Sequence, residues 1–180
     1  MEKYKNIEFG ISVEIPHGWS VMPAAWTKTM RLKAAPTSEE LALLLSKAQT
    51  PFLYIQKPTD NENLPVATVQ FVAKPKSVLV AVGGMKKLLD AAIDQFKIAF
   101  PDFQCLEASE EIIVAGLRCG YLKSSMSVLN EHGGRFFCLS ELFVIESKRA
   151  LFMVGMSGSI IDSEYPEAAF KSILRSVNFF

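Results

Sequence analysis

Histidine and cysteine are scarce in this sequence, which limits the chemistry that it can support. Its 180 residues include two histidines and three cysteines. His17 and His132 lie far apart, and neither has a second histidine or a cysteine at the spacing of zinc ligands. An odd number of cysteines without a close pair is typical of reduced thiols in a cytoplasmic protein. We therefore expect no metal site, and we interpret Cys105, Cys119 and Cys138 as small core residues within strands.

The sequence also lacks an excess of charge and a long apolar segment. Its formal net charge is zero, whereas proteins that bind nucleic acid usually carry a basic excess. The uncharged run at residues 77–85 is far shorter than the roughly 20 residues of a membrane helix. No apolar segment follows Met1 in the manner of a signal peptide. We expect a cytoplasmic protein that neither spans a membrane nor binds nucleic acid.

A run of three strands is the clearest structural pattern present. Residues 118–128, 135–145 and 150–156 are rich in Phe, Val, Ile and Leu, and their two joints are short and rich in turn-forming or charged residues. Short joints place consecutive strands antiparallel to one another. The sequence therefore predicts an antiparallel meander. Its last strand lacks polar residues on both faces, so we expect a central strand covered on both sides.

Helices and further strands are predicted around the meander. Apolar residues repeat at helical spacing from Met85 to Phe100, and Pro101 ends that helix. A second helix should begin near Pro166 and a third at Thr37, where Glu40 completes a capping box. Strand patterns cover residues 7–9, 11–15, 52–56, 66–73, 103–108 and 111–114, and residues 178–180 are expected to form a short edge strand. With 49% hydrophobic residues and no linker, residues 1–180 are predicted to form a single domain.

Catalytic motifs are not recognisable. The segment at residues 155–159 does not have the G-x-S-x-G spacing of a nucleophile elbow, and Gly83-Gly84 is not part of a phosphate-binding motif. The pair Glu110-Glu111 would face opposite ways on a strand, so these carboxylates should not share a proton and should both be exposed. We predict no catalytic residue and no cofactor.

Aromatic and sulfur-containing side chains offer a more specific hint of function. Trp19 and Trp26 flank a segment with few core signals, and Met30 and Arg31 follow it. Such a cluster, if exposed, is typical of a surface that binds a protein or peptide. The alternative is that the tryptophans anchor this segment to the core. Trp19, Trp26, Met30 and Arg31 are thus candidate partner-binding residues.

The order of these elements resembles that of a known family. Phe9-x-Ile11 with Ile15-Pro16-x-Gly18-Trp19 resembles the opening of PsbP-like and Mog-like domains, and Ser176-Val177-Asn178-Phe179 after a helix resembles their ending. The resemblance implies an α/β fold, an α/β/α sandwich with a mainly antiparallel sheet that contains the meander. It also implies a role in binding, with bacterial DcrB-like proteins and effector chaperones as the branches expected here.

Two hypotheses of function follow. The first is a non-enzymatic protein-binding module, an adaptor or a chaperone for a partner protein, which predicts an exposed apolar patch. The second is a small-molecule-binding protein or an enzyme of unrecognised type, which predicts an enclosed pocket with convergent polar groups. A homodimer through a sheet edge or through the meander fits either hypothesis.

Overall fold

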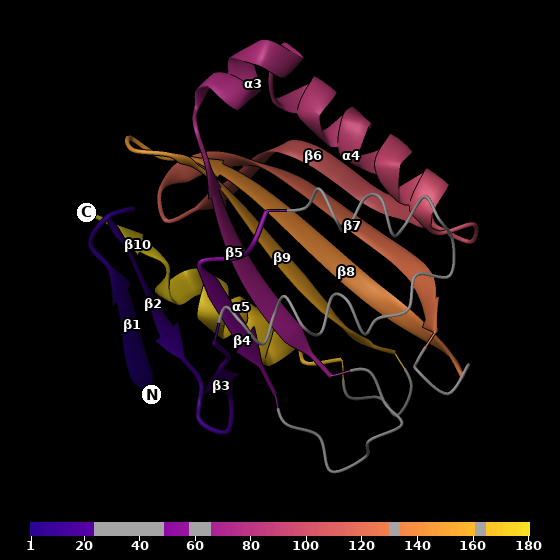
Figure 1. Ribbon diagram of the computed structural model, residues 1–180, viewed down its shortest axis with the longest axis horizontal. Helices are drawn as coiled ribbons and strands as arrows, with labels where there is room; N and C mark the ends of the chain where they lie inside the picture. Colours follow the sequence, from indigo (N-terminus) through magenta and orange to yellow (C-terminus); the bar gives the residue numbers. More distant parts are fainter. Residues whose placement is uncertain (24–48, 58–65, 130–133, 161–164) are drawn as a thin grey trace.

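Most of the chain is organised by one large antiparallel sheet. The computed structural model describes residues 1–23, 49–57, 66–129, 134–160 and 165–180. Seven strands form the large sheet in the order β3-β4-β5-β9-β8-β7-β6, and every neighbouring pair is antiparallel (Figure 1). Their bounds are β3 Ser20–Val21, β4 Leu53–Gln56, β5 Thr68–Lys74, β6 Gln104–Val114, β7 Leu117–Leu129, β8 Arg135–Glu146 and β9 Leu151–Ser159.

The predicted meander is confirmed as β7, β8 and β9. Cys119 lies opposite Ile145, and Ile145 lies opposite Phe152, so one line of side chains crosses all three strands. Strand β9 lies between β5 and β8, as expected of a central strand. Its two faces differ in burial, however: Phe152, Val154 and Met156 are buried, whereas Met153 and Gly155 are only partly buried. Leu151, which shares the second face, is buried in the core beneath α4 (Met85–Ala99), so β9 is covered on both sides, as predicted.

A second, three-stranded sheet joins the two ends of the chain. Strand β2 (Ile11–Ile15) pairs with β1 (Glu2–Asn6) on one side and with β10 (Asn178–Phe179) on the other. The first strand therefore lies before residues 7–9, where the sequence predicted a strand. Those residues form the turn between β1 and β2 instead. The turn forms there because the Asn6 side chain accepts a hydrogen bond from the Phe9 N–H (2.9 Å) and Gly10 has a positive φ of 63°.

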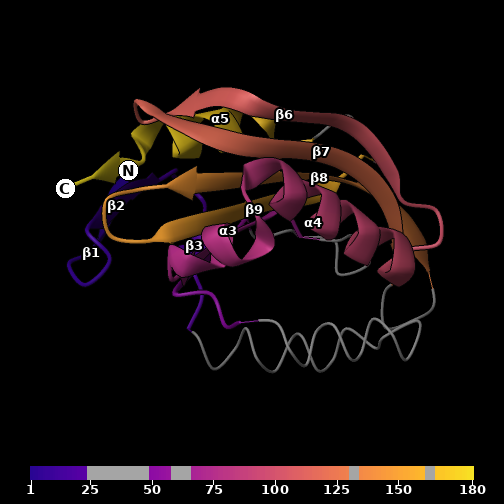
Figure 2. The same ribbon diagram turned by 90° about the horizontal axis from the view of Figure 1, so that it is seen from above.

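Helices α3 (Ser77–Val82) and α4 (Met85–Ala99) cover one face of the large sheet (Figure 2). Helix α4 ends at Ala99, one residue before the predicted end, and its apolar stripe packs around Leu89 in a core with Leu122, Val144 and Leu151. A side chain at Gly120 of β7 would come within 2.6 Å of Met85, so glycine there permits the close approach of α4. Helix α3 was not predicted, because it is short and has no buried residue to produce an apolar stripe.

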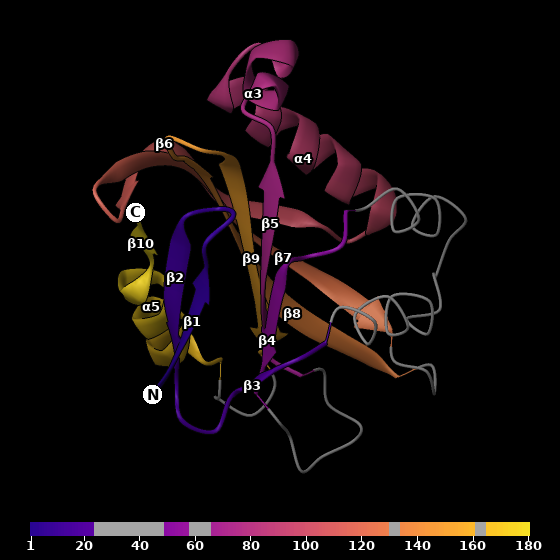
Figure 3. The same ribbon diagram turned by 60° about the vertical axis from the view of Figure 1, so that its left-hand side comes forward.

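The opposite face carries the main core, beneath α5 (Glu167–Ser176) and the small sheet (Figure 3). Phe170 and Ile173 of α5 are buried there with Val69, Phe71 and Ala73, which share one face of β5. The molecule is thus an α/β/α sandwich, as expected, with one outer layer shared by a helix and a small sheet. The helix predicted from Thr37 lies outside the described residues.

Strand β6 differs from its prediction in two ways. It is one strand rather than two, because register shifts between Cys105 and Glu107 and between Ser109 and Ile112 bend it without ending it. Cys105 is exposed rather than part of the core, because β6 lies at the edge of the sheet. Cys119 and Cys138 are buried, as predicted.

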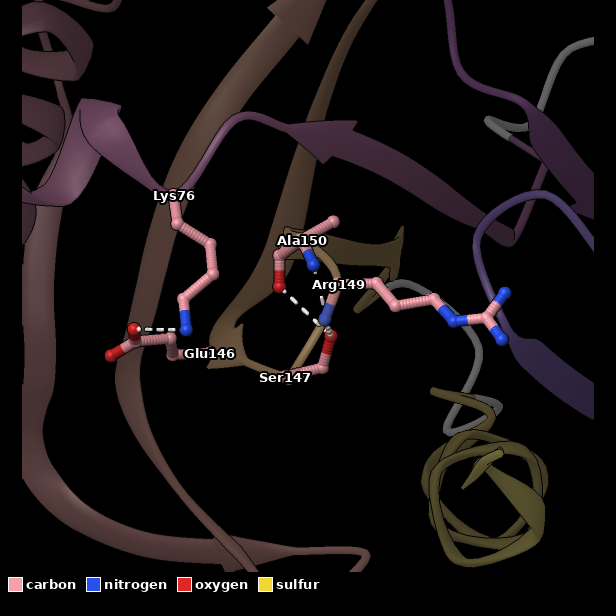
Figure 4. Close-up of polar contacts among 5 residues, drawn as sticks. All are labelled: Lys76, Glu146, Ser147, Arg149 and Ala150. Carbon is pink, nitrogen blue, oxygen red and sulfur yellow. Dashed lines mark hydrogen bonds and ion pairs between the residues drawn. The ribbon is translucent and has the colours of Figure 1, made fainter.

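The β8–β9 turn connects the large sheet to the small one (Figure 4). The buried Ser147 hydroxyl accepts hydrogen bonds from the N–H groups of Arg149 (3.2 Å) and Ala150 (3.1 Å). Arg149 then extends to the small sheet, where its guanidinium donates to the Ile7 carbonyl at 2.8 Å. On the other side of the turn, Lys76 forms an ion pair with Glu146 at 3.0 Å. These contacts fix the turn from both sides.

Candidate functional site

The far end of the meander exposes apolar side chains on the face that α5 covers elsewhere. Alternate residues of β8 point to this face; Phe143 and Ile145 belong to the main core, whereas Phe137 is 55% exposed. The Ile160 N–H donates to the Phe137 carbonyl at 3.0 Å, so Ile160 continues the strand pairing opposite Phe137, and it is 42% exposed. Two large apolar side chains thus lie together beyond the helix that would otherwise bury them.

These side chains line an open pocket of about 410 Å³, which we call the meander-end pocket. Its lining residues are Asp102, Gln104, Ser125, Met126, Phe137 and Ile160. They come from the start of β6, from β7, from β8 and from the residue after β9. A surface that accepts an apolar side chain of a partner usually has apolar walls with a few polar groups at one side.

Asp102 carries the negative charge of the pocket and is held in place by β7. Its carboxylate accepts a hydrogen bond from the Ser127 N–H at 3.0 Å and a second one from the Ser127 hydroxyl. These bonds, together with the positive charge of Arg135, hold the pKa of the Asp102 carboxyl below its usual range. The carboxylate is therefore ionised at neutral pH and is a fixed acceptor beside the apolar wall.

Two tyrosines of the main core lie near Glu141. The Tyr165 hydroxyl donates to the Glu141 carboxylate at 3.2 Å, and Tyr121 lies beside Phe143. Burial, and next the negative charge of Glu141, raise the pKa of both phenols. Both phenols therefore stay protonated at neutral pH, and Tyr165 uses its proton in the hydrogen bond to Glu141.

The other candidates for chemistry that the structure describes are turn or core residues. His17 is an exposed residue of a turn closed by the Trp19 N–H and the Pro16 carbonyl (3.2 Å), whereas His132 lies outside the described residues. Burial raises the pKa of the Cys119 and Cys138 thiols to about 11, so neither is an ionised nucleophile at neutral pH. Within the described part of the chain, no three His, Cys, Asp or Glu side chains gather as a metal site.

The weaker sequence motifs also have structural roles. Ser157 lies within β9, where its hydroxyl is 3.0 Å from that of Thr68. Gly83 and Gly84 join α3 to α4. Glu111 is exposed as predicted, but Glu110 is only partly exposed. No helix in the ranges described is long and apolar enough to cross a membrane.

The residues predicted to bind a partner are only partly placed. The Trp19 ring packs edge-on against Phe170 at 5.8 Å between centroids and lies partly buried against the main core. This is the anchoring arrangement that the sequence left open as the alternative. Trp26, Met30 and Arg31 lie outside the described residues. Sequence reasoning missed Phe137 and Ile160. The available signal was the pair Phe136-Phe137, because adjacent strand residues face opposite sides of the sheet and the pair therefore places one phenylalanine on each face.

No model of a known protein family matches this chain, and neither does any curated protein. Among solved structures, cyanobacterial PsbP (CyanoP) of Synechocystis is 11% identical, with 99% of this chain and 92% of that chain covered and a TM-score of 0.58. The Ran-binding protein Mog1p of Saccharomyces cerevisiae is 9% identical, with coverage of 99% and 94% and a TM-score of 0.51. A protein of unknown function from Pseudomonas aeruginosa is 12% identical, with coverage of 72% and 84% and a TM-score of 0.50.

Similarity at these identities is informative about fold. It shows that this chain has the PsbP/Mog-like fold that its sequence resembles. A shared fold does not carry over a function, since one fold supports many sites.

Proposed function

We propose that this chain is a non-enzymatic protein-binding module, an adaptor or chaperone that holds an apolar side chain of its partner in the meander-end pocket. The observation that carries the proposal is the exposed pair Phe137 and Ile160 beside the fixed carboxylate of Asp102. Exposed apolar groups that adjoin an ordered acceptor are typical of a recognition surface, where the apolar part supplies affinity and the polar part orientation.

The similar structures are consistent with this proposal. One of them is named as a Ran-binding protein, so a protein of this fold binds another protein. We extend the proposal to a cytoplasmic bacterial protein, in keeping with the buried, unpaired thiols of Cys119 and Cys138. Trp26, Met30 and Arg31 stay proposed as additional contacts.

A small-molecule-binding role is the second candidate. The volume of about 410 Å³ lies within the range of small-ligand pockets. The pocket is open, however, and Asp102 is the charged group among its lining residues, whereas small-ligand sites usually enclose most of the ligand. The same experiment can distinguish the two candidates.

The test is affinity purification of the tagged protein from its own host, with quantitative mass spectrometry of the proteins and metabolites that co-elute. Wild type is compared with Phe137→Ser and with Ile98→Ser, which alters an exposed apolar residue on α4 at the other face. We expect a stoichiometric protein that is retained by wild type and by Ile98→Ser and is lost with Phe137→Ser. Thermal melting of each variant shows that the fold is intact.

Two results would contradict the proposal. One is a partner that is retained equally by all three proteins, which would place the contact elsewhere. The other is an eluate without a partner protein but with a metabolite that depends on Phe137, which would support the small-molecule role.

A further inference from the structure

The outer edge of β6 is the long open edge of the large sheet. Strand β6 is the last strand in the sheet order, and no strand among the described residues pairs with its outer side (Figure 2). It is 11 residues long, whereas β3 at the opposite edge has two. An edge strand presents unpaired backbone N–H and C=O groups along its length, which can accept a further strand from another chain.

The charge of this edge is of one sign. Glu107, Glu110 and Glu111 lie on β6, which has no lysine, arginine or histidine. The nearest basic residues in the ladder lie one strand further in: Lys123 is opposite Glu107, and Arg118 is opposite Ile113. An incoming strand would therefore meet carboxylates first.

A second copy of this chain fits the edge poorly. An antiparallel pairing of two β6 strands would bring the three glutamates of each copy close to those of the other. Like charges directly opposite one another destabilise a strand pair. The two register shifts add to this effect, because bulges interrupt the regular ladder that a long self-pairing needs.

We propose that the β6 edge binds an extended basic segment of a partner protein as an added strand. Lysines or arginines of the segment would pair with Glu107 on one face of the strand and with Glu111 on the other, because the register shift between Ser109 and Ile112 changes the alternation of side chains. Its apolar side chains would contact Leu106 and Ile113, which are both exposed on β6. Because the register shifts interrupt the ladder, the paired stretch is short, and charge complementarity supplies much of the specificity.

This inference rests on the proposed protein-binding function but uses a different surface. The meander-end pocket adjoins the edge at Gln104, where β6 begins. A partner can therefore engage both surfaces, yet each is tested by its own variant. Loss of partner binding by Phe137→Ser would show that the pocket contributes to binding. Loss of binding after charge reversal on β6 would show that the edge contributes.

The experiment uses a fluorescein-labelled eight-residue peptide, Lys-Lys-Val-Val-Lys-Lys-Val-Val, which presents lysines on both faces of a strand. Its binding to the full chain is measured by fluorescence anisotropy. The matched comparison is the same peptide with glutamate in place of lysine. We expect the lysine peptide to bind and the glutamate peptide not to bind. The double variant Glu107→Lys/Glu111→Lys should weaken binding about tenfold, because two favourable charge pairs become repulsive.

Controls separate strand addition from general attraction between charges. The double variant Glu2→Lys/Glu8→Lys makes the same change of charge at exposed residues of the small-sheet hairpin and should leave the affinity within about twofold of wild type. A lysine peptide with every second backbone nitrogen methylated cannot donate along one edge and should bind about tenfold more weakly. Amide chemical shifts on titration should change along residues 104–114.

Other outcomes would overturn the inference. Equal loss of affinity in the two double variants would show attraction to net charge alone. Unchanged affinity of the methylated peptide would show that no strand is added. Absence of lysine-peptide binding, or shift changes confined to other elements, would remove the edge as a site. A concentration-dependent dimer that forms through β6 would assign the edge to a second copy instead.

Discussion

Gly10 is a position at which the backbone and its surroundings both exclude a side chain. Its φ is 63°, and a Cβ atom there would lie 2.5 Å from the Phe180 carbonyl oxygen and 3.0 Å from the Arg149 side chain. Gly18 also has a positive φ, of 80°, but nothing lies within 4 Å of the position of its Cβ atom. A comparison of alanine substitutions at the two glycines therefore separates the free-energy cost of backbone strain from that of steric crowding.

We predict that Gly10→Ala destabilises the protein by about 2–4 kcal/mol and Gly18→Ala by about 1 kcal/mol. The first substitution adds a clash with backbone to the strain of the left-handed conformation, whereas the second adds strain only. Urea denaturation of the two variants measures the difference. Equal losses of stability would show that the Gly10 turn can shift to make room.

At the scale of single residues, the sequence predicted burial better than it predicted exposure. Cys119 and Cys138 were correctly predicted to be buried, because apolar neighbours surround them in the sequence. Cys105 has apolar neighbours too, but its exposure depends on β6 being the edge strand, and strand order is not written in local sequence. Phe137 is exposed for a similar reason: α5 does not extend to that end of the sheet.

At the scale of elements, α4 shows how a stripe of apolar residues fixes a helix on the sheet. Leu89 is 3% exposed and contacts the core with Leu122 and Val144, whereas Ile98 on the same helix is 64% exposed. The two residues have side chains of equal size and lie in the same helix, so they differ mainly in burial.

We expect Leu89→Ala to lower the free energy of unfolding by about 2–5 kcal/mol, because it leaves a cavity beneath α4. Ile98→Ala should change it by less than about 0.5 kcal/mol, since the residue is exposed and alanine favours helices. Chemical denaturation monitored by circular dichroism gives both values. A large loss with Ile98→Ala would mean that this exposed side chain has a partner in solution.

Elements with strong periodicity were predicted well, and elements without it were not. The helix from Met85 and the three meander strands follow from apolar residues spaced at their own period. Helix α3 is too short to show such a period, and β6 contains two register shifts that disturb the alternation of a strand. In both cases the local sequence is compatible with the observed element but does not distinguish it from a loop or a break.

At the scale of the whole molecule, the two ends of the chain meet in the small sheet, and the β8–β9 turn attaches that sheet to the large one. The sequence predicted a strand near each end, and the family resemblance implied the sandwich. Neither could predict the attachment, because it depends on one long side chain that reaches a distant backbone. Arg149 donates to the carbonyl groups of Ile7 (2.8 Å) and Glu8 (3.5 Å).

We predict that Arg149→Ala loosens the small sheet while the large sheet keeps its structure. Hydrogen bonds from a charged donor contribute about 1.5–3 kcal/mol, so amides of β1 and β10 should exchange with solvent at least about tenfold faster. Lys148→Ala is the matched control, because Lys148 is an exposed residue of the same turn. Hydrogen exchange measured by mass spectrometry resolves the two sheets.

Faster exchange throughout the protein would show that Arg149 supports global stability, and unchanged exchange would show that the strand pairing of β2 alone holds the small sheet. Faster exchange confined to β1 and β10 would identify the Arg149 contact as the link between the two ends of the chain and the meander.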